Sequence, residues 1–146
     1  MPQLTFPTSP DGLPVDVLIG LAAGEAASRR AAKQKVPFAV EVRGLLDTAT
    51  DITMVHSSVL SQVGAPKVAS ATTNTAGGTV PVNVFEVRLA IGDARNPGGP
   101  MLHVPSLLVM ELQHQIPNAA CLIGLDILFQ CKLFLDGPGQ SFTLEF

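Results

Sequence analysis

The sequence contains no tryptophan and no tyrosine, and only 5% of its residues are aromatic. Charged residues are also scarce, at 14%, and the net charge is −3. A chain without a basic stripe and without aromatic side chains for base stacking is not expected to bind nucleic acid. His56, His103 and His114 are far apart in the sequence and lack metal-ligand spacing, so we expect no metal and no cofactor.

Long apolar runs are missing as well, and cysteine is rare. No run approaches the length that spans a bilayer, and the N-terminus lacks the basic start of a secretion signal. We therefore expect a soluble, cytoplasmic protein with no membrane partner. Cys121 and Cys131 are the only cysteines. We expect them to be reduced, buried thiols, with a structural disulfide as the alternative.

The length of 146 residues is typical of one domain, and no repeat or boundary interrupts it, so we expect a single domain over residues 1–146. Hydrophobic residues make up 47% of the chain, which excludes a disordered protein. Such an apolar chain is expected to bury part of its surface in an oligomer, because an obligate interface resembles a protein core.

The 12 prolines and 13 glycines are spread along the chain and cut it into short apolar runs. This spacing predicts an all-β fold with many turns. A change in the phase of alternation at Phe85 and Glu86 predicts a bulge or bend within one long strand. The expected strands are residues 4–6, 15–21, 38–42, 80–91, 102–110, 121–123, 132–135 and 141–146.

Three other segments have helical composition. Residues 22–35 are rich in helix formers, but their apolar members are all alanine, so we expect an exposed insertion, helical or loose. Residues 57–63 predict a short helix with a serine cap, ended by Gly64. Residues 125–130 predict one short helix near the C-terminus.

Asp47 directly follows an apolar strand and precedes small residues. A carboxylate in such a place is costly unless it is paired or hydrogen-bonded. It could cap its own turn, which is the simplest interpretation. Alternatively, small neighbours could leave room for a ligand beside the carboxylate. The local pattern alone leaves both interpretations open.

The segment Leu-Leu-Asp-Thr-Ala-Thr at residues 45–50 resembles the signature of the aspartic proteases, in which two apolar residues precede Asp-Thr/Ser-Gly. Two further segments follow in the same order as in that family. Ala76, Gly77, Gly78 and Thr79 stand where the family has the tip of its flap hairpin. Leu122, Ile123 and Gly124 stand where the family has two apolar residues and a glycine before a short C-terminal helix. With the ending Phe-Leu-Asp-Gly-Pro-Gly at residues 134–139, the chain looks closest to bacterial retropepsin-like proteins. The resemblance implies a closed or partly open β-barrel of the retropepsin type with one short C-terminal helix.

The resemblance also implies an aspartic endopeptidase that acts as a homodimer on a peptide or protein. One carboxylate takes a proton from water while a carboxylic acid donates a proton to the carbonyl oxygen, so two carboxyl groups are needed. This chain has one such segment, and a second copy would supply the second Asp47. Thr48 would hydrogen-bond across the dimer axis, and Ala49 and Thr50 would line the cleft. A terminal strand, such as residues 141–146, could pair across the same axis.

Two positions depart from the family pattern. Ala49 stands where glycine is usual, and its methyl group could strain the backbone or crowd the substrate. Leu125 stands where retroviral enzymes commonly have an arginine that pairs with an acid at the position of Asp51, so Asp51 is expected to be exposed or to meet Arg43. Two alternatives therefore remain open: a non-catalytic dimeric peptide-binding module of the same fold, weakened by Ala49, and an unrelated small β-barrel in which Asp47 is structural.

Overall fold

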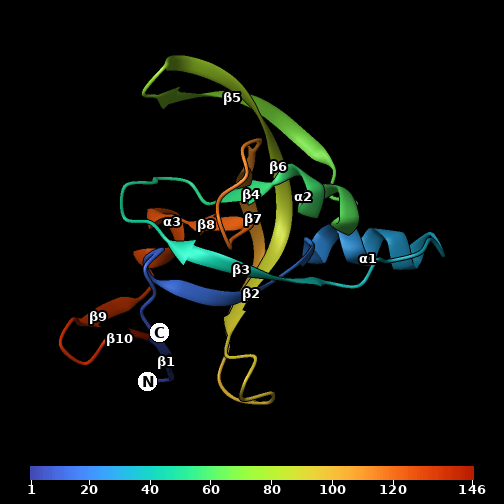
Figure 1. Ribbon diagram of the computed structural model, residues 1–146. Coiled ribbons are helices and arrows are strands. Elements are labelled where there is room, and N and C mark those ends of the chain that lie inside the picture. The colour runs from blue at the N-terminus through green and yellow to red at the C-terminus, as the bar shows by residue number, and fades with distance from the viewer.

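The short apolar runs form ten strands in the computed structural model, which describes all 146 residues (Figure 1). The larger sheet has the strand order β2-β3-β8-β4-β7-β6-β5, and β2 also pairs with β6. Six strands therefore close into a barrel, and β5 extends from β6, which confirms the expected β-barrel. The strands are β2 (Pro14–Leu21), β3 (Val40–Leu46), β4 (Met54–His56), β5 (Lys67–Thr75), β6 (Gly78–Gly92), β7 (Leu102–Leu112) and β8 (Cys121–Ile123).

A second sheet joins the two ends of the chain. It contains β1 (Gln3–Pro7), β10 (Ser141–Glu145) and β9 (Lys132–Asp136), in the antiparallel order β1-β10-β9. The rings of Phe6 and Phe142 stack across it with centroids 5.5 Å apart. Because β10 is the middle strand, both of its edges pair within the chain. The expectation that residues 141–146 pair across a dimer axis is therefore wrong.

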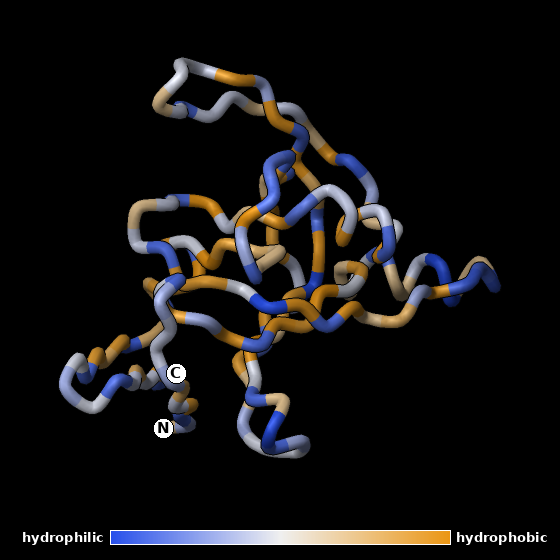
Figure 2. Tube along the Cα trace, in the orientation of Figure 1, coloured by the Kyte–Doolittle hydropathy of each residue, from blue (hydrophilic) through white to orange (hydrophobic).

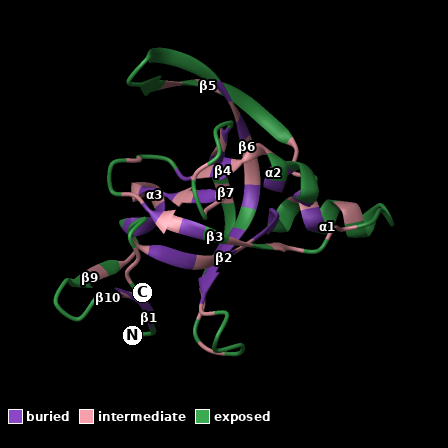
Figure 3. Ribbon diagram, in the orientation of Figure 1, coloured by how far each residue is buried: buried purple, intermediate pink, exposed green.

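The barrel interior is filled by alternate residues of its strands. Val17 and Ile19 of β2 and Leu89 and Ile91 of β6 are completely buried. Each such side chain stabilises the fold by about 1.5–3 kcal/mol relative to exposure. Hydrophobic residues concentrate along these strands in Figure 2, and Figure 3 shows the same segments buried, whereas the β5–β6 hairpin and the β9–β10 turn are exposed.

Along the long strand β6, buried and less buried residues alternate, and this alternation shifts by one position between Val84 and Val87, as the sequence predicts. Of the predicted bulge or bend at Phe85 and Glu86, the bulge is wrong, because β6 has no extra residue there. The register shifts lie in its partners instead, one in β5 after Lys67 and one in β7 beside Pro105. Proline has no N–H for the ladder, so the extra residue is accommodated on its strand.

Two short helices match the predictions closely, with one correction. They are α2 (Ser57–Val63) and α3 (Leu125–Leu128). Gly64 ends α2 in the left-handed region at φ 69°. The cap of α2 is His56 and not a serine, since the His56 Nδ1 atom accepts a hydrogen bond of 3.2 Å from the Ser58 backbone N–H. An imidazole nitrogen can satisfy a free helical N–H as a hydroxyl does.

Residues 22–35 contain helix α1 (Ala23–Ala31) and are mostly exposed. This agrees with the expected exposed insertion, apart from Ala22 and Ala26, which are buried. Arg29 fixes the helix to the barrel side by donating a hydrogen bond of 3.0 Å to the carbonyl oxygen of Gly64. The segment is thus attached by two buried alanine side chains and by the hydrogen bond from Arg29.

Two smaller corrections concern single residues. Phe38 precedes β3 and is 92% exposed, so it is not part of a half-buried strand. Cys121 and Cys131 are free thiols, as expected, but only Cys121 is fully buried. Burial, with the nearby charge of Asp126, raises the pKa of the Cys121 thiol far above its usual range. No helix in the structure is both long enough and apolar enough to cross a membrane.

Candidate active site

Asp47 is placed by the pairing of β3 with β8. These strands run parallel, with Leu45 opposite Leu122 and Leu46 opposite Ile123. The Asp47 backbone N–H extends this ladder by donating a hydrogen bond of 2.9 Å to the carbonyl oxygen of Ile123. Asp47 thus stands at the end of a buried strand, and its side chain is half-buried.

The carboxylate of Asp47 is held by the residues two and three positions further along the chain. The Ala49 N–H donates to Oδ1 at 2.9 Å, and the Thr50 hydroxyl donates to Oδ2 at 2.7 Å. This is the turn-capping geometry of the simpler of the two interpretations that the local pattern leaves open. Each carboxylate oxygen accepts a single hydrogen bond within the chain, so each keeps capacity for a further donor such as water. Thr48 is exposed, and its hydroxyl makes no hydrogen bond within the chain.

Gly124 fixes the segment that follows Asp47. A Cβ atom at Gly124 would lie 2.7 Å from the Thr50 carbonyl oxygen and 3.0 Å from the Thr53 backbone nitrogen. Only glycine therefore allows this close approach. The Gly124 N–H donates to the Thr53 hydroxyl at 3.0 Å, and the Leu125 N–H donates to the Thr50 carbonyl at 2.8 Å.

Asp126 completes this attachment, and sequence reasoning did not identify it. Its carboxylate accepts hydrogen bonds from the Thr53 N–H at 2.9 Å and the Thr53 hydroxyl at 2.7 Å. Asp51 is exposed and has no ion pair with Arg43 or any other residue. Asp126 thus anchors the segment that follows Asp47. Retroviral enzymes commonly have an arginine at the position of Leu125, and here the anchoring does not require it. The only sequence signal was an acid at the start of a helix.

The β5–β6 hairpin rises above this segment (Figure 1). Thr75 pairs with Gly78, so Ala76 and Gly77 form a two-residue turn. Gly78 has φ +113°, which glycine adopts without strain. The Thr75 hydroxyl donates to the Gly78 carbonyl at 2.8 Å and accepts from the Gly77 N–H at 3.2 Å. The expected tip residues therefore lie at a hairpin turn, with Thr79 just beyond it.

A cavity of about 480 Å³ separates the hairpin from the Asp47 segment. Its volume lies within the usual range for ligand sites. Ala49 and Thr50, which hydrogen-bond the Asp47 carboxylate, are in its wall. The remaining wall comes from the hairpin, the end of β7 and the segment before β4, namely residues 51, 52, 54, 72–75, 80–82 and 110–114. Asp47 is therefore adjacent to a cavity large enough for part of a peptide.

No protein family model matches the sequence, and neither does any curated protein. Among solved structures, a retropepsin-like aspartic protease from Rickettsia conorii superposes with a TM-score of 0.60 at 12% identity, over 97% of this chain and 89% of that chain. This chain has the retropepsin-like fold. An unrelated small β-barrel is thereby excluded. At such low identity the likeness shows the fold alone.

Two further solved structures match with lower TM-scores. The protease of EIAV in complex with the inhibitor HBY-793 has a TM-score of 0.41 at 23% identity, over 65% of this chain and 83% of that chain. The retroviral protease-like domain of Ddi1 from Leishmania major has a TM-score of 0.47 at 13% identity, over 92% of this chain and 94% of that chain.

Proposed function

We propose that two copies of this chain form an aspartic endopeptidase in which the two Asp47 side chains face each other. The observation that carries the proposal is the position of Asp47. It lies at the end of β3 in a retropepsin-like fold, held by Ala49 and Thr50 in the wall of the cavity. One chain supplies a single carboxyl group at this place, and acid–base hydrolysis requires two.

The chemistry follows from two carboxyl groups that share one proton, because two such groups in contact cannot both ionise. The ionised Asp47 takes a proton from water as the water oxygen bonds to the peptide carbon. The protonated Asp47 of the partner subunit gives its proton to the carbonyl oxygen. The C–N bond of the resulting gem-diol then breaks, with a proton passing to the leaving nitrogen. The Ala49 and Thr50 donors keep each carboxylate oriented throughout.

The substrate is an extended peptide that lies between the Asp47 segment and the hairpin. Thr72 to Thr75 of β5 supply hydroxyl and backbone polar groups to the cavity, and Val80 and Val82 of β6 supply apolar surface. An extended chain presents alternate side chains to such walls. Ala76, Gly77, Gly78 and Thr79 act as the flap tip over the substrate. The free thiols are those of a protein in a reducing compartment such as the cytoplasm.

Ala49 favours a second candidate, a dimeric peptide-binding module without turnover. The residues with positive φ outside glycine are Lys33, Asn118 and Gln140, so Ala49 is not strained. Its methyl group is nevertheless exposed in the cavity wall, beside the carboxylate. Crowding of water or substrate, and not backbone strain, is the way in which Ala49 could suppress catalysis.

A cleavage assay with Asp47→Asn tests the proposal. Asparagine keeps an acceptor for the Ala49 N–H but cannot act as the acid or base, so we expect at least about a hundredfold loss of peptide cleavage at acidic pH. The melting temperature should be nearly unchanged. Glu25→Gln on α1 is the control and should retain full activity. Equal cleavage by the Asp47→Asn variant would exclude the mechanism, and a wild type that binds peptides without cleaving them would favour the binding module.

A further inference from the structure

The proposed site is incomplete without a second copy, so the edges of the terminal sheet become important. β10 has no free edge, because it lies between β1 and β9. Two edges remain, the outer side of β1 and the outer side of β9. Their different protection indicates where a second copy can attach.

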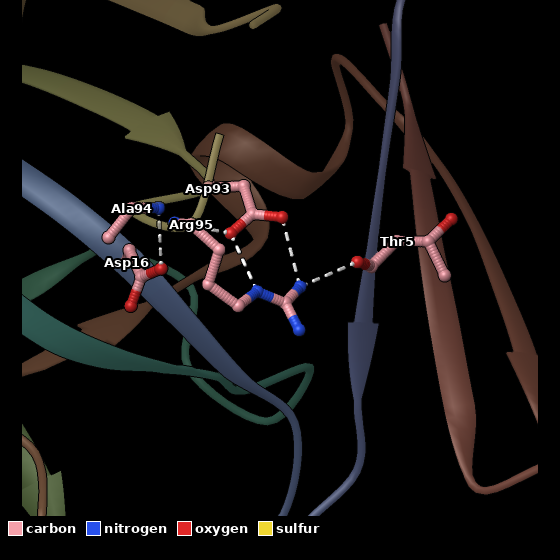
Figure 4. Close-up of polar contacts among 5 residues, drawn as sticks. All are labelled: Thr5, Asp16, Asp93, Ala94 and Arg95. Carbon is pink, nitrogen blue, oxygen red and sulfur yellow. Dashed lines mark hydrogen bonds and ion pairs between the residues drawn. The ribbon is translucent and has the colours of Figure 1, made fainter. Parts of the chain in front are cut away.

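The outer edge of β1 is already occupied. The Thr8 N–H bonds to the Gln140 carbonyl, and in an antiparallel pair the hydrogen-bonded residues alternate, so Thr5 directs its backbone groups outward. The Thr5 carbonyl accepts a hydrogen bond of 3.3 Å from Arg95 Nη2 (Figure 4). Pro7 has no N–H to offer on the same edge. A new strand on this side would have to displace Arg95.

In Figure 4 the Arg95 guanidinium lies between the Asp93 carboxylate and the Thr5 carbonyl, and the Arg95 side chain is 62% exposed. Its guanidinium forms two hydrogen bonds with the Asp93 carboxylate, at 2.8 and 2.9 Å. The loop between β6 and β7, which contains Arg95, also contacts β2, because the Ala94 N–H donates a hydrogen bond of 2.9 Å to the Asp16 carboxylate. The side-chain hydrogen bond from Arg95 lowers the pKa of Asp93, so the pair stays ionised near neutral pH. This clamp protects the edge of β1 from strand addition.

The outer edge of β9 is open and apolar. By the same alternation, Leu133 and Leu135 direct their backbone N–H and C=O groups away from β10. Phe134 is 54% exposed and Leu135 is 62% exposed, although Leu135 lies on the face that carries the buried Phe142. An exposed apolar edge strand of this kind readily pairs with another strand.

We propose that β9 pairs antiparallel with β9 of a second copy about a two-fold axis at Phe134. The three-stranded terminal sheets of the two chains then form one continuous sheet of six strands. In this register Leu133 forms a hydrogen-bonded pair with Leu135 of the partner subunit. The two Phe134 side chains face each other across the axis, and the exposed leucines become covered.

The charges on β9 select this arrangement. Lys132 and Asp136 lie at opposite ends of the strand and on the same face as Phe134. Lys132 already pairs with Glu145 of its own chain at 2.6 Å, and antiparallel pairing at Phe134 adds Asp136 of the partner subunit opposite it, twice. Parallel pairing in register would put Lys132 opposite Lys132, which is unfavourable. The edge is therefore complementary to itself, which identifies the occupant as a second copy of this chain.

The location of the β9 edge agrees with the proposed function. That the occupied state is a dimer rests on this proposed function. The β9 strand, the end of β3 that carries Asp47 and the tip of the β5–β6 hairpin all lie on one side of the molecule, at the left of Figure 1. Strand pairing alone covers less area than the roughly 1,200–2,000 Å² of a stable interface. Contacts around Thr48 and the hairpin tip would supply the remainder.

Cross-linking tests the register directly. Residues in a non-hydrogen-bonded antiparallel pair have Cα atoms about 4.5 Å apart, within the range for a disulfide. In a Cys131→Ser background, Phe134→Cys should form a covalent dimer under mild oxidation. The matched control is Thr143→Cys, on the same face but in the middle strand, which should remain a monomer on a non-reducing gel. Equal cross-linking of the two variants would overturn the proposal.

Leu135→Pro separates this interface from the rest of the site. The proline removes only an outward N–H and leaves the β9–β10 ladder intact, so dimerisation should weaken at least about tenfold in sedimentation, with the melt of the monomer retained. Leu135→Lys should act in the same way. If both Leu135 variants still dimerise and cleave peptides like the wild type, the β9 interface is wrong and the proposed function stands. A β9-dependent dimer without cleavage would sustain the interface and overturn the peptidase.

Discussion

Thr53 donates two hydrogen bonds to the carboxylate of Asp126, one from its backbone N–H at 2.9 Å and one from its hydroxyl at 2.7 Å. Thr53 is completely buried and is the one polar residue in the buried set. Its hydroxyl also accepts from the Gly124 N–H at 3.0 Å. This pair therefore joins the segment after Asp47 to α3 across 73 residues of sequence.

Thr53→Val should lower the free energy of unfolding by about 2–3 kcal/mol, because valine removes a hydrogen bond to a charged group and leaves the Gly124 N–H without an acceptor. Chemical denaturation measures the effect. Thr72→Val, at an exposed threonine without a side-chain hydrogen bond, is the control and should change stability by less than about 0.5 kcal/mol. Similar losses in both variants would mean that the buried network contributes little.

Gly124→Ala should be destabilising by about 1–3 kcal/mol, because the added methyl meets the backbone at Thr50 and Thr53 and not a flexible side chain. Gly24→Ala is the matched control. A Cβ atom there meets nothing within 4 Å, and alanine favours the helix, so this variant should be neutral or slightly more stable. Thermal melts of the two variants in parallel decide whether close approach is what requires Gly124.

Ala49→Gly should raise turnover and slightly lower stability. Glycine increases the freedom of the unfolded chain, which costs about 0.4–1 kcal/mol where the native backbone suits alanine, as it does here. Removing the methyl group clears space beside the Asp47 carboxylate. A misplacement of about 1 Å at such a site can cost on the order of a hundredfold in rate. Turnover and melting temperature should be measured together. Unchanged or lower turnover would show that the methyl group is not limiting.

Hydrogen exchange should differ strongly along the β5–β6 hairpin. The turn at Ala76 and Gly77 is exposed, whereas Val87, Leu89 and Ile91 are completely buried and pair with both β2 and β7. Exchange at the tip should be at least about a thousandfold faster, since local opening there breaks few contacts. Equal protection at both ends would contradict the assignment of a mobile flap tip.

Much of the architecture could be predicted because it depends on local patterns. Alternating apolar residues and turn residues located eight of the ten strands and missed β4 and β5. The short motifs around Asp47 and Gly124 indicated the resemblance to the aspartic proteases. Predictions failed where a partner strand or a single contact decided the outcome. The register shifts lie in β5 and β7 and not in β6. The hydrogen bond from Arg29 to Gly64, which attaches helix α1, could not be read from the alanine-rich composition of that segment.

The sequence by itself determined the all-β composition and the strand end that carries Asp47, and both follow from side-chain periodicity. The resemblance to the aspartic proteases indicated the hairpin tip at residues 76–79, where the structure has a turn at Ala76 and Gly77. Only the tertiary structure decided that Asp126 holds Thr53, that β10 is a middle strand and that Arg95 covers the edge of β1. Each of these depends on hydrogen bonds between residues 70 or more positions apart, and no local pattern encodes which distant donor meets which acceptor.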